Sequence, residues 1–306
     1  MFKSLKSNFI VTTGCIVIIF IACTIAFMNV VLMKRIDERI NNLYKATHII
    51  QSILEIRNLE KDFIINKDLR YREQLMTLRN TTKKILVQLT GKFSKAKHEE
   101  NLRTINKELD NYFINFDEYA KSTEQQIELD AAMVETARTL DREVKDIRTE
   151  LDTGKTEADR LKKNNDLNQL LIYYLEARRH EKNYILRHDS LYIERVMNNI
   201  QLMFSLSDSL KGQFQGQFYK EKMNDVVHQI EDYKNSFDKY LAIDELKKKN
   251  ETKMVQTASN IQRIAYETIL EEKNLMTNEM MRAKLLIQFL TAVVILSGVL
   301  IISSFE

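Results

Sequence analysis

The chain has 306 residues, of which none is proline and six are glycine. Average usage would give roughly 15 prolines and about twenty glycines. β-Sandwiches, β-barrels and glycine-looped nucleotide folds are therefore excluded, and an all-α protein is predicted. Lys and Arg total 46 against 43 Asp and Glu, a net charge of +3 with both signs interspersed. This balance offers no electrostatic surface for nucleic acid.

Two segments near the ends of the chain carry no charged side chain, residues 9–32 and residues 285–305. As helices they would be about 36 Å and about 31 Å long, enough to cross a hydrocarbon core of about 30 Å. A cleaved signal peptide is the alternative for the first segment, but its apolar core ordinarily has only about 7–15 residues. We therefore predict two transmembrane helices, with residues 1–8 as a cytoplasmic N-terminus.

Residues 33–284 form the segment between the two predicted spans. Both cysteines, Cys15 and Cys23, lie in the first span, so no disulfide is available to this segment. Positive charges flank the two ends of the first span almost equally, but long loops translocate largely regardless of their charge. We expect residues 33–284 to lie outside the cytoplasm.

Helical signals continue through this segment. Apolar residues follow a heptad spacing on one face at Met133, Ala137, Leu140, Val144, Ile147 and Leu151. Two turns are predicted at Asn66-Lys67-Asp68 and Arg187-His188-Asp189, each with its Asp as the N-cap of the next helix. Interruptions of the apolar periodicity at four glycines predict further helix ends, at Gly91, Gly154, Gly212 and Gly216.

An internal repeat relates residues 54–119 to residues 175–240 at a constant offset of 121, with 18 identities in 66 positions. It aligns glycines and aromatic residues, which helical composition alone would not do, and Arg142 with Arg263 extends it. We interpret it as a duplicated unit of three helices, at 33–66, 68–90 and 95–152 and then at 157–187, 190–213 and 217–284.

The helix lengths suggest how the two units combine. The third and sixth helices would be about 85 Å and about 100 Å long, twice the length of the others. We therefore predict two stacked four-helix bundles that share these two long helices and return both ends of the chain to the membrane. This arrangement requires an unbroken helix over residues 95–150, because the third helix must take part in both bundles.

The repeated pattern Arg-x-x-Glu-Lys-(Asp/Asn)-(Phe/Tyr)-Ile between two spans resembles the helical bimodular sensor domain of bacterial chemoreceptors and sensor histidine kinases. The opening Met-Phe-Lys-Ser-Leu-Lys is similar to chemoreceptor starts. The resemblance implies a bacterial inner (plasma) membrane protein whose periplasmic or extracellular domain detects a small ligand, often a carboxylate, in one or both bundles. Family members continue into a linker-helix module and a methyl-accepting or kinase domain. The sequence ends at Glu306, so it stays open whether a methyl-accepting or a kinase domain is the output module.

Arginines of the repeat are the candidate ligand-binding residues. Arg57 and Arg263 are expected at nearly the same height above the membrane, about 37 Å and about 33 Å, where two guanidiniums would suit a planar carboxylate. Arg142, Arg178 and Arg179 form a second candidate set. They would lie at the same height above the membrane only if the chain turns near residue 160, between the third and fourth helices. Both Gly154 and Lys163-Asn164-Asn165-Asp166 are candidate turns. The alternative is ordinary ion pairs on solvated faces, with Glu60, Glu181 or Glu267 as partners.

The other repeated side chains are interpreted structurally. The Glu60-Lys61 and Glu181-Lys182 pairs would fix helical corners by capping or by pairing with a neighbouring helix. The aromatic residues are expected in the core, at Phe63, Tyr112, Phe116, Tyr119, Tyr184, Tyr233, Phe237 and Tyr240. The histidines have no metal- or haem-binding spacing, and no catalytic motif is present, so neither a cofactor nor an enzyme activity is expected.

Two classes of function remain. A sensor would bind a small organic acid, shift the sixth helix against the first and act as a homodimer through the first helix. A scaffold would be a membrane-tethered helical rod that docks a soluble periplasmic binding protein. A buried polar pocket at Arg57 and Arg263 would favour the sensor. A wholly apolar interior in the bundle nearer the membrane, together with an exposed apolar patch, would favour the scaffold.

Overall fold

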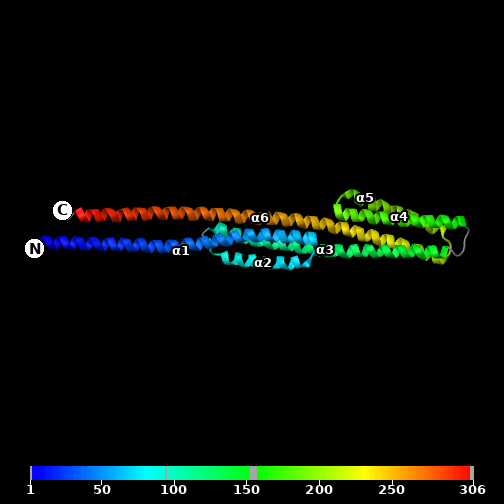
Figure 1. The fold of residues 1–306 in the computed structure, drawn as a ribbon, viewed down its shortest axis with the longest axis horizontal. Helices are drawn as coiled ribbons and strands as arrows, with labels where there is room; N and C mark the ends of the chain where they lie inside the picture. The colour runs from blue at the N-terminus through cyan, green and yellow to red at the C-terminus, as the bar shows by residue number, and fades with distance from the viewer. Residues whose placement is uncertain (1, 94, 152–156, 304–306) are drawn as a thin grey trace. The chain divides into compact units, whose positions relative to one another are not determined.

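The structure, a computed structural model, describes residues 2–93, 95–151 and 157–303. Every element in these ranges is an α-helix, which confirms the all-α fold class (Figure 1). The six helices are α1 (Phe2–Asn66), α2 (Leu69–Leu89), α3 (Ala96–Leu151), α4 (Glu157–Arg187), α5 (Ser190–Gln213) and α6 (Gln217–Ser303).

The long helices are continuous. The unbroken α3 confirms the predicted third helix. No helix boundary separates the apolar segments from the rest, since α1 runs through residue 33 and α6 through residue 284. By length and composition, both α1 and α6 could cross a membrane, and the most apolar part of each is unburied.

The two predicted turns are confirmed and are nearly identical in conformation. Lys67 and His188 have φ of 54° and 53°, the left-handed conformation that commonly ends a helix. Asp68 and Asp189 follow as N-caps, and each side chain accepts a hydrogen bond of 2.9 Å from the backbone N–H two residues later. The repeat therefore includes the corner geometry as well as the residues.

The glycine predictions are partly confirmed. Gly91 and Gly216 lie in the links before α3 and α6, with φ of 75° and 105°, where a side chain would be strained. Gly212 is the residue before the last one of α5, which ends at Gln213, so the helix end predicted there is confirmed. Gly154 lies outside the described residues. The alternative turn at residues 163–166 is wrong, because these residues lie within α4.

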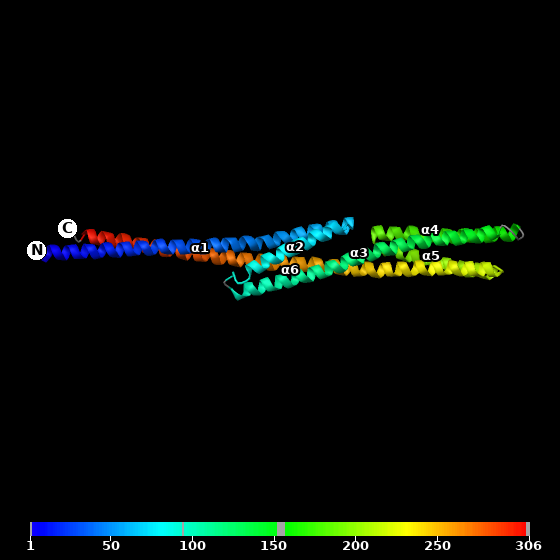
Figure 2. The same cartoon turned by 90° about the horizontal axis from the view of Figure 1, so that it is seen from below.

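The first compact unit comprises Met1–Ile114 and Lys253–Glu306. It combines α1 and α2 with the first part of α3 and the latter part of α6, and α1 and α2 lie side by side in both views (Figures 1 and 2). Four helices contribute fully buried apolar side chains, among them Ile53, Leu75, Leu109 and Ile261.

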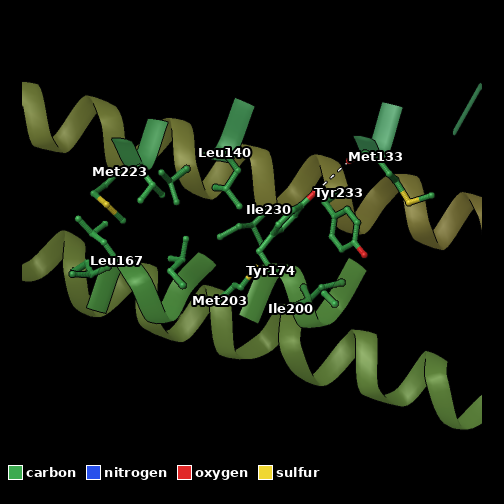
Figure 3. Packing of buried hydrophobic residues seen from close by; sticks show 14 of the residues in the cluster. Met133, Leu140, Leu167, Tyr174, Ile200, Met203, Met223, Ile230 and Tyr233 are labelled. Carbon is green, nitrogen blue, oxygen red and sulfur yellow. Dashed lines mark hydrogen bonds between the residues drawn. The ribbon is translucent and has the colours of Figure 1, made fainter. Parts of the chain in front are cut away.

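The second unit, Asn115–Thr252, has one buried cluster to which α3, α4, α5 and α6 all contribute (Figure 3). The heptad face of α3 lies in it: five of its six residues are at most 1% exposed, and Ala137 packs against them half-buried. Tyr174 of α4 donates a 3.2 Å hydrogen bond to the backbone carbonyl of Met133. The predicted core role of the aromatic residues is confirmed in both units, where all eight are at most 5% exposed.

Candidate functional site

A buried cluster of an arginine, a glutamate and a tyrosine occurs once in each unit, at positions related by the repeat. The i,i+3 spacing places Arg57 and Glu60 on the same face of α1, in its last turns before the Lys67 corner. Arg178 and Glu181 have the same placement on α4. The tyrosine comes from the following long helix, α3 in the first unit and α6 in the second.

In the first unit the glutamate is the centre of the cluster. Glu60 is 0% exposed, and Nη1 of Arg57 donates to both of its carboxylate oxygens, with 2.5 Å to Oε2. The hydroxyl of Tyr112 also donates to Oε2. The Arg57 side chain is 19% exposed, so the ion pair is largely removed from water and links α1 to α3.

In the second unit the same three residue types meet with more charged neighbours. Nη1 of Arg178 donates to Oε2 of Glu181, and the Tyr233 hydroxyl donates to the same oxygen at 2.9 Å. Asp130 of α3 lies 3.9 Å from Arg178 and also accepts from Lys182. Oε1 of Glu181 is buried with no hydrogen bond and lies 3.7 Å from Lys182 Nζ.

Burial and pairing have opposite effects on these groups. Burial raises the pKa of Tyr112 well above its usual value, and the Glu60 carboxylate raises it further. Burial acts to lower the pKa of Arg57 but is outweighed by Glu60 and Tyr112, so the guanidinium pKa is raised and its charge is held. In the second unit, burial raises the pKa of Glu181 despite the opposing effects of Arg178 and Tyr233.

Glu181 should therefore give the second unit a characteristic pH dependence. Its pKa lies above the ordinary 4.5, so the folded protein binds this proton more tightly than the unfolded chain does. The contribution of Glu181 to the free energy of unfolding is thus largest below pH 4.5 and falls as the pH rises through the raised pKa. We expect the free energy of unfolding of Glu181→Gln, relative to wild type, to increase with pH across this window in urea denaturation. A difference that does not change with pH would contradict this.

The five predicted arginines differ in environment. Arg57 and Arg178 lie in the buried clusters, whereas the other three lie on exposed surfaces. Arg263 is 59% exposed and pairs with Glu267 at 3.1 Å, Arg179 pairs with Glu176, and Arg142 donates to Thr139 at 3.3 Å. The expected ion-pair partners Glu60, Glu181 and Glu267 are all observed, but the first two are buried instead of solvated. The carboxylate clamp stays a prediction.

A second polar cluster of the first unit was missed by the sequence analysis. His98, at the start of α3, is 0% exposed, with Nδ1 2.5 Å from Glu272 and Nε2 3.0 Å from Glu271. Nη1 of Arg39 lies 3.7 Å from the same Glu272, which connects α1 to the cluster. Hydrogen bonds from Lys97 and then from His98 lower the pKa of Glu271 to about 2.

The repeat contained a signal for this second cluster. Extending the 121-residue offset aligns Leu151 with Glu272 and Tyr219 with His98, so two positions that are apolar or aromatic in one unit are ionisable in the other. Buried ionisable groups at such positions indicate a local requirement other than packing. Among the described residues, no group of three or more His, Cys, Asp or Glu side chains could hold a metal ion.

Comparisons with known proteins identify no relative. No family model matches the chain, and no curated protein matches it.

Proposed function

We propose that the chain is the input region of a bacterial transmembrane chemoreceptor or sensor kinase. In this proposal an extracytoplasmic four-helix bundle binds a small carboxylate and passes a helix displacement across the membrane. The observation that carries the proposal is the duplicated buried cluster, in which a guanidinium inside each unit is held by one carboxylate. A planar carboxylate ligand has the same donor requirements as Glu60 and Glu181.

The ligand would compete with the internal glutamate. Arg57 uses Nη1 for Glu60, and its side chain is partly exposed, so an incoming carboxylate can reach the guanidinium. Joining Arg263 to the same ligand would require this exposed side chain to leave Glu267. Because Tyr112 ties Glu60 to α3, a change of partner at Arg57 would alter the contact between α1 and α3.

Continuity of the helices supports the transmission step. α6 runs without interruption from residue 217 through the second apolar segment, and α1 runs from the first apolar segment to Asn66. A helix of this kind carries a displacement of an ångström or two to the membrane when two packed arrangements lie within a few kcal/mol.

Ligand binding by the full chain in lipid nanodiscs tests the proposal. Thermal unfolding would be followed with mono- and dicarboxylic acids and amino acids, because binding to the folded state alone raises Tm. We expect a saturable rise with at least one acid. Calorimetry should then give a Kd at least about tenfold weaker for Arg57→Ala, since a charge-assisted hydrogen bond contributes about 1.5–3 kcal/mol.

Arg103→Ala is the matched control, because Arg103 is 76% exposed on the same unit and pairs with the exposed Glu100 at 3.6 Å. Its Kd should equal that of wild type. An unchanged Kd in Arg57→Ala would overturn the assignment of the site.

The homodimer in this proposal would use an unoccupied face of α1. Exposed residues follow a 4-3-4-3 spacing at Ile40, Tyr44, Thr47, Gln51 and Leu54, and two of them, Tyr44 and Leu54, are 70% and 52% exposed. This spacing is typical of a helix that pairs with a second copy.

We therefore expect cysteines at positions 44, 47 and 51 to crosslink between subunits. Cysteines at the intervening buried positions Ala46 and Ile49 should not. The measurement is disulfide formation in native membranes, with Cys15 and Cys23 replaced by serine. Equal crosslinking at all five positions would contradict an α1 interface.

The scaffold is the second candidate function, and one feature of the second unit favours it. α3 and α6 border an open, mostly apolar groove of about 470 Å³, lined by Leu129, Ala132, Ala242, Ile243 and neighbouring polar residues. A soluble binding protein could dock there. Replacing Ala242 with a charged residue would then abolish docking of the binding protein. Direct binding of small acids to the chain would stay unchanged.

A further inference from the structure

The second polar cluster has polar side chains at two positions that are apolar in the sister unit. At the 121-residue offset, Ile147 corresponds to Thr268 and Leu151 to Glu272, and all four side chains are at most 4% exposed. Tyr219, which stacks on Phe214 at 4.9 Å in the second unit, corresponds to His98, which meets Phe93 edge-on at 5.9 Å. The corresponding layer of the second unit keeps one ionisable group, since Lys163, at the position of Asn42, is 4% exposed and lies 5.5 Å over the Phe214 ring. At the positions of His98 and Glu272 it has Tyr219 and Leu151, so the His98–Glu272 pair calls for an explanation.

A small cavity opens beside this pair. Its volume is about 120 Å³, and it is lined by Arg39 and Asn42 of α1, Lys92 and Phe93 of the link before α3, and Glu272 of α6. At about 30 Å³ per water, the cavity holds about four waters or a molecule of about four heavy atoms. Three separate parts of the first unit thus meet around one small space.

The donors at the cavity are incompletely used. Nη1 of Arg39 is buried and has no hydrogen bond, and it lies 3.7 Å from a carboxylate oxygen of Glu272, whereas Nη2 of the same guanidinium donates to Glu279 at 3.0 Å. Within the described parts of the chain, no residue pairs with the Lys92 ammonium. Glu272 is already hydrogen-bonded to His98, and Glu271 is held by His98 and Lys97. The groups that line the cavity therefore comprise two cations, of which Arg39 also pairs with Glu279, and one carboxylate that His98 already contacts.

We infer that this cavity binds a small planar oxyanion of about four heavy atoms, a short monocarboxylate or an inorganic oxyanion, through Arg39 and Lys92. A guanidinium N–H without a partner and a nearby ammonium are the groups that such an anion requires. The amide of Asn42 supplies a further donor at the wall. Phe93 closes the apolar side, which suits the methyl group of a monocarboxylate.

The inferred site is separate from the proposed carboxylate site. Arg39 and Arg57 are 18 residues apart on α1, about 27 Å along the helix axis. The inference does not depend on the proposed sensor function, because it rests on the cavity and on the unused donors. An anion bound here would join α1, the link before α3 and α6 close to the two apolar segments.

The test uses the full chain in lipid nanodiscs, equilibrated in potassium gluconate, whose anion is too large for the cavity. Sodium acetate and sodium nitrate are titrated separately at constant ionic strength, and thermal unfolding is followed by circular dichroism. We expect a saturable rise in Tm with acetate, nitrate or both. Acetate alone would identify a carboxylate site, and nitrate alone an inorganic oxyanion site.

Lys92→Gln is the main variant, because Lys92 is exposed on a link and its replacement leaves the fold intact. The apparent Kd should rise at least tenfold in Lys92→Gln and in Arg39→Gln. Arg160→Gln, at the position that corresponds to Arg39 in the second unit, should leave it unchanged. The inference is overturned if neither anion gives a saturable shift, or if Lys92→Gln binds as tightly as wild type.

Discussion

Replacing Arg57 with alanine is expected to lower the free energy of unfolding by about 3 kcal/mol, because it leaves a buried carboxylate without its cation. Glu60 is 0% exposed and accepts from Nη1 of Arg57 through both oxygens. After the substitution the Tyr112 hydroxyl still donates to it.

Urea denaturation followed by circular dichroism measures this effect. Arg103→Ala should change the free energy of unfolding by less than about 0.5 kcal/mol, as exposed sites usually do. The double variant Arg57→Leu/Glu60→Leu should recover most of the loss, since a hydrophobic pair often replaces a buried ion pair at no cost. If Arg57→Ala were as stable as wild type, Glu60 would not depend on this cation.

Leu140→Ala should cost about 2–5 kcal/mol, the range for a buried leucine whose removal leaves a cavity. Leu140 is 0% exposed at the centre of the heptad face of α3, surrounded by residues of the other three helices of the second unit (Figure 3). Chemical denaturation of Leu140→Ala, compared with Arg138→Ala, measures this cost. Arg138 is 73% exposed two residues away, so its loss should be nearly neutral. Equal stabilities for the two variants would mean that this face of α3 does not carry the core.

Much of the fold was readable from the sequence because its signals are local. Helix ends depend on a few adjacent residues, and the Lys67 and His188 corners were found from the Asp that follows each of them. The heptad face of α3 was found from spacing alone, since periodicity reports which side of a helix is buried.

The candidate site was less predictable because its contacts join separate helices. The repeat drew attention to Arg57 and Arg178 and named Glu60 and Glu181 as alternative partners. The tyrosine donors depend on the register between α1 and α3 and between α4 and α6, which spacing along one helix does not determine. Arg263 was placed beside Arg57 by height alone, but height says nothing about the face of a helix, and its side chain is 59% exposed.

The measurement that tests the central claim most directly is the rate of disulfide formation between α1 and α6 next to the apolar segments. Val31 and Ile287 line one cavity of about 190 Å³ between these helices, so cysteines at both positions, with Cys15 and Cys23 replaced by serine, would report on the spacing between α1 and α6. The rate would be compared in nanodiscs with and without the carboxylic acid that gives the largest saturable rise in Tm. A sensor that moves α6 against α1 predicts a rate that changes on binding and stays constant in Arg57→Ala. The same rate with and without saturating acid, when calorimetry shows that the acid is bound, would contradict transmission through these helices.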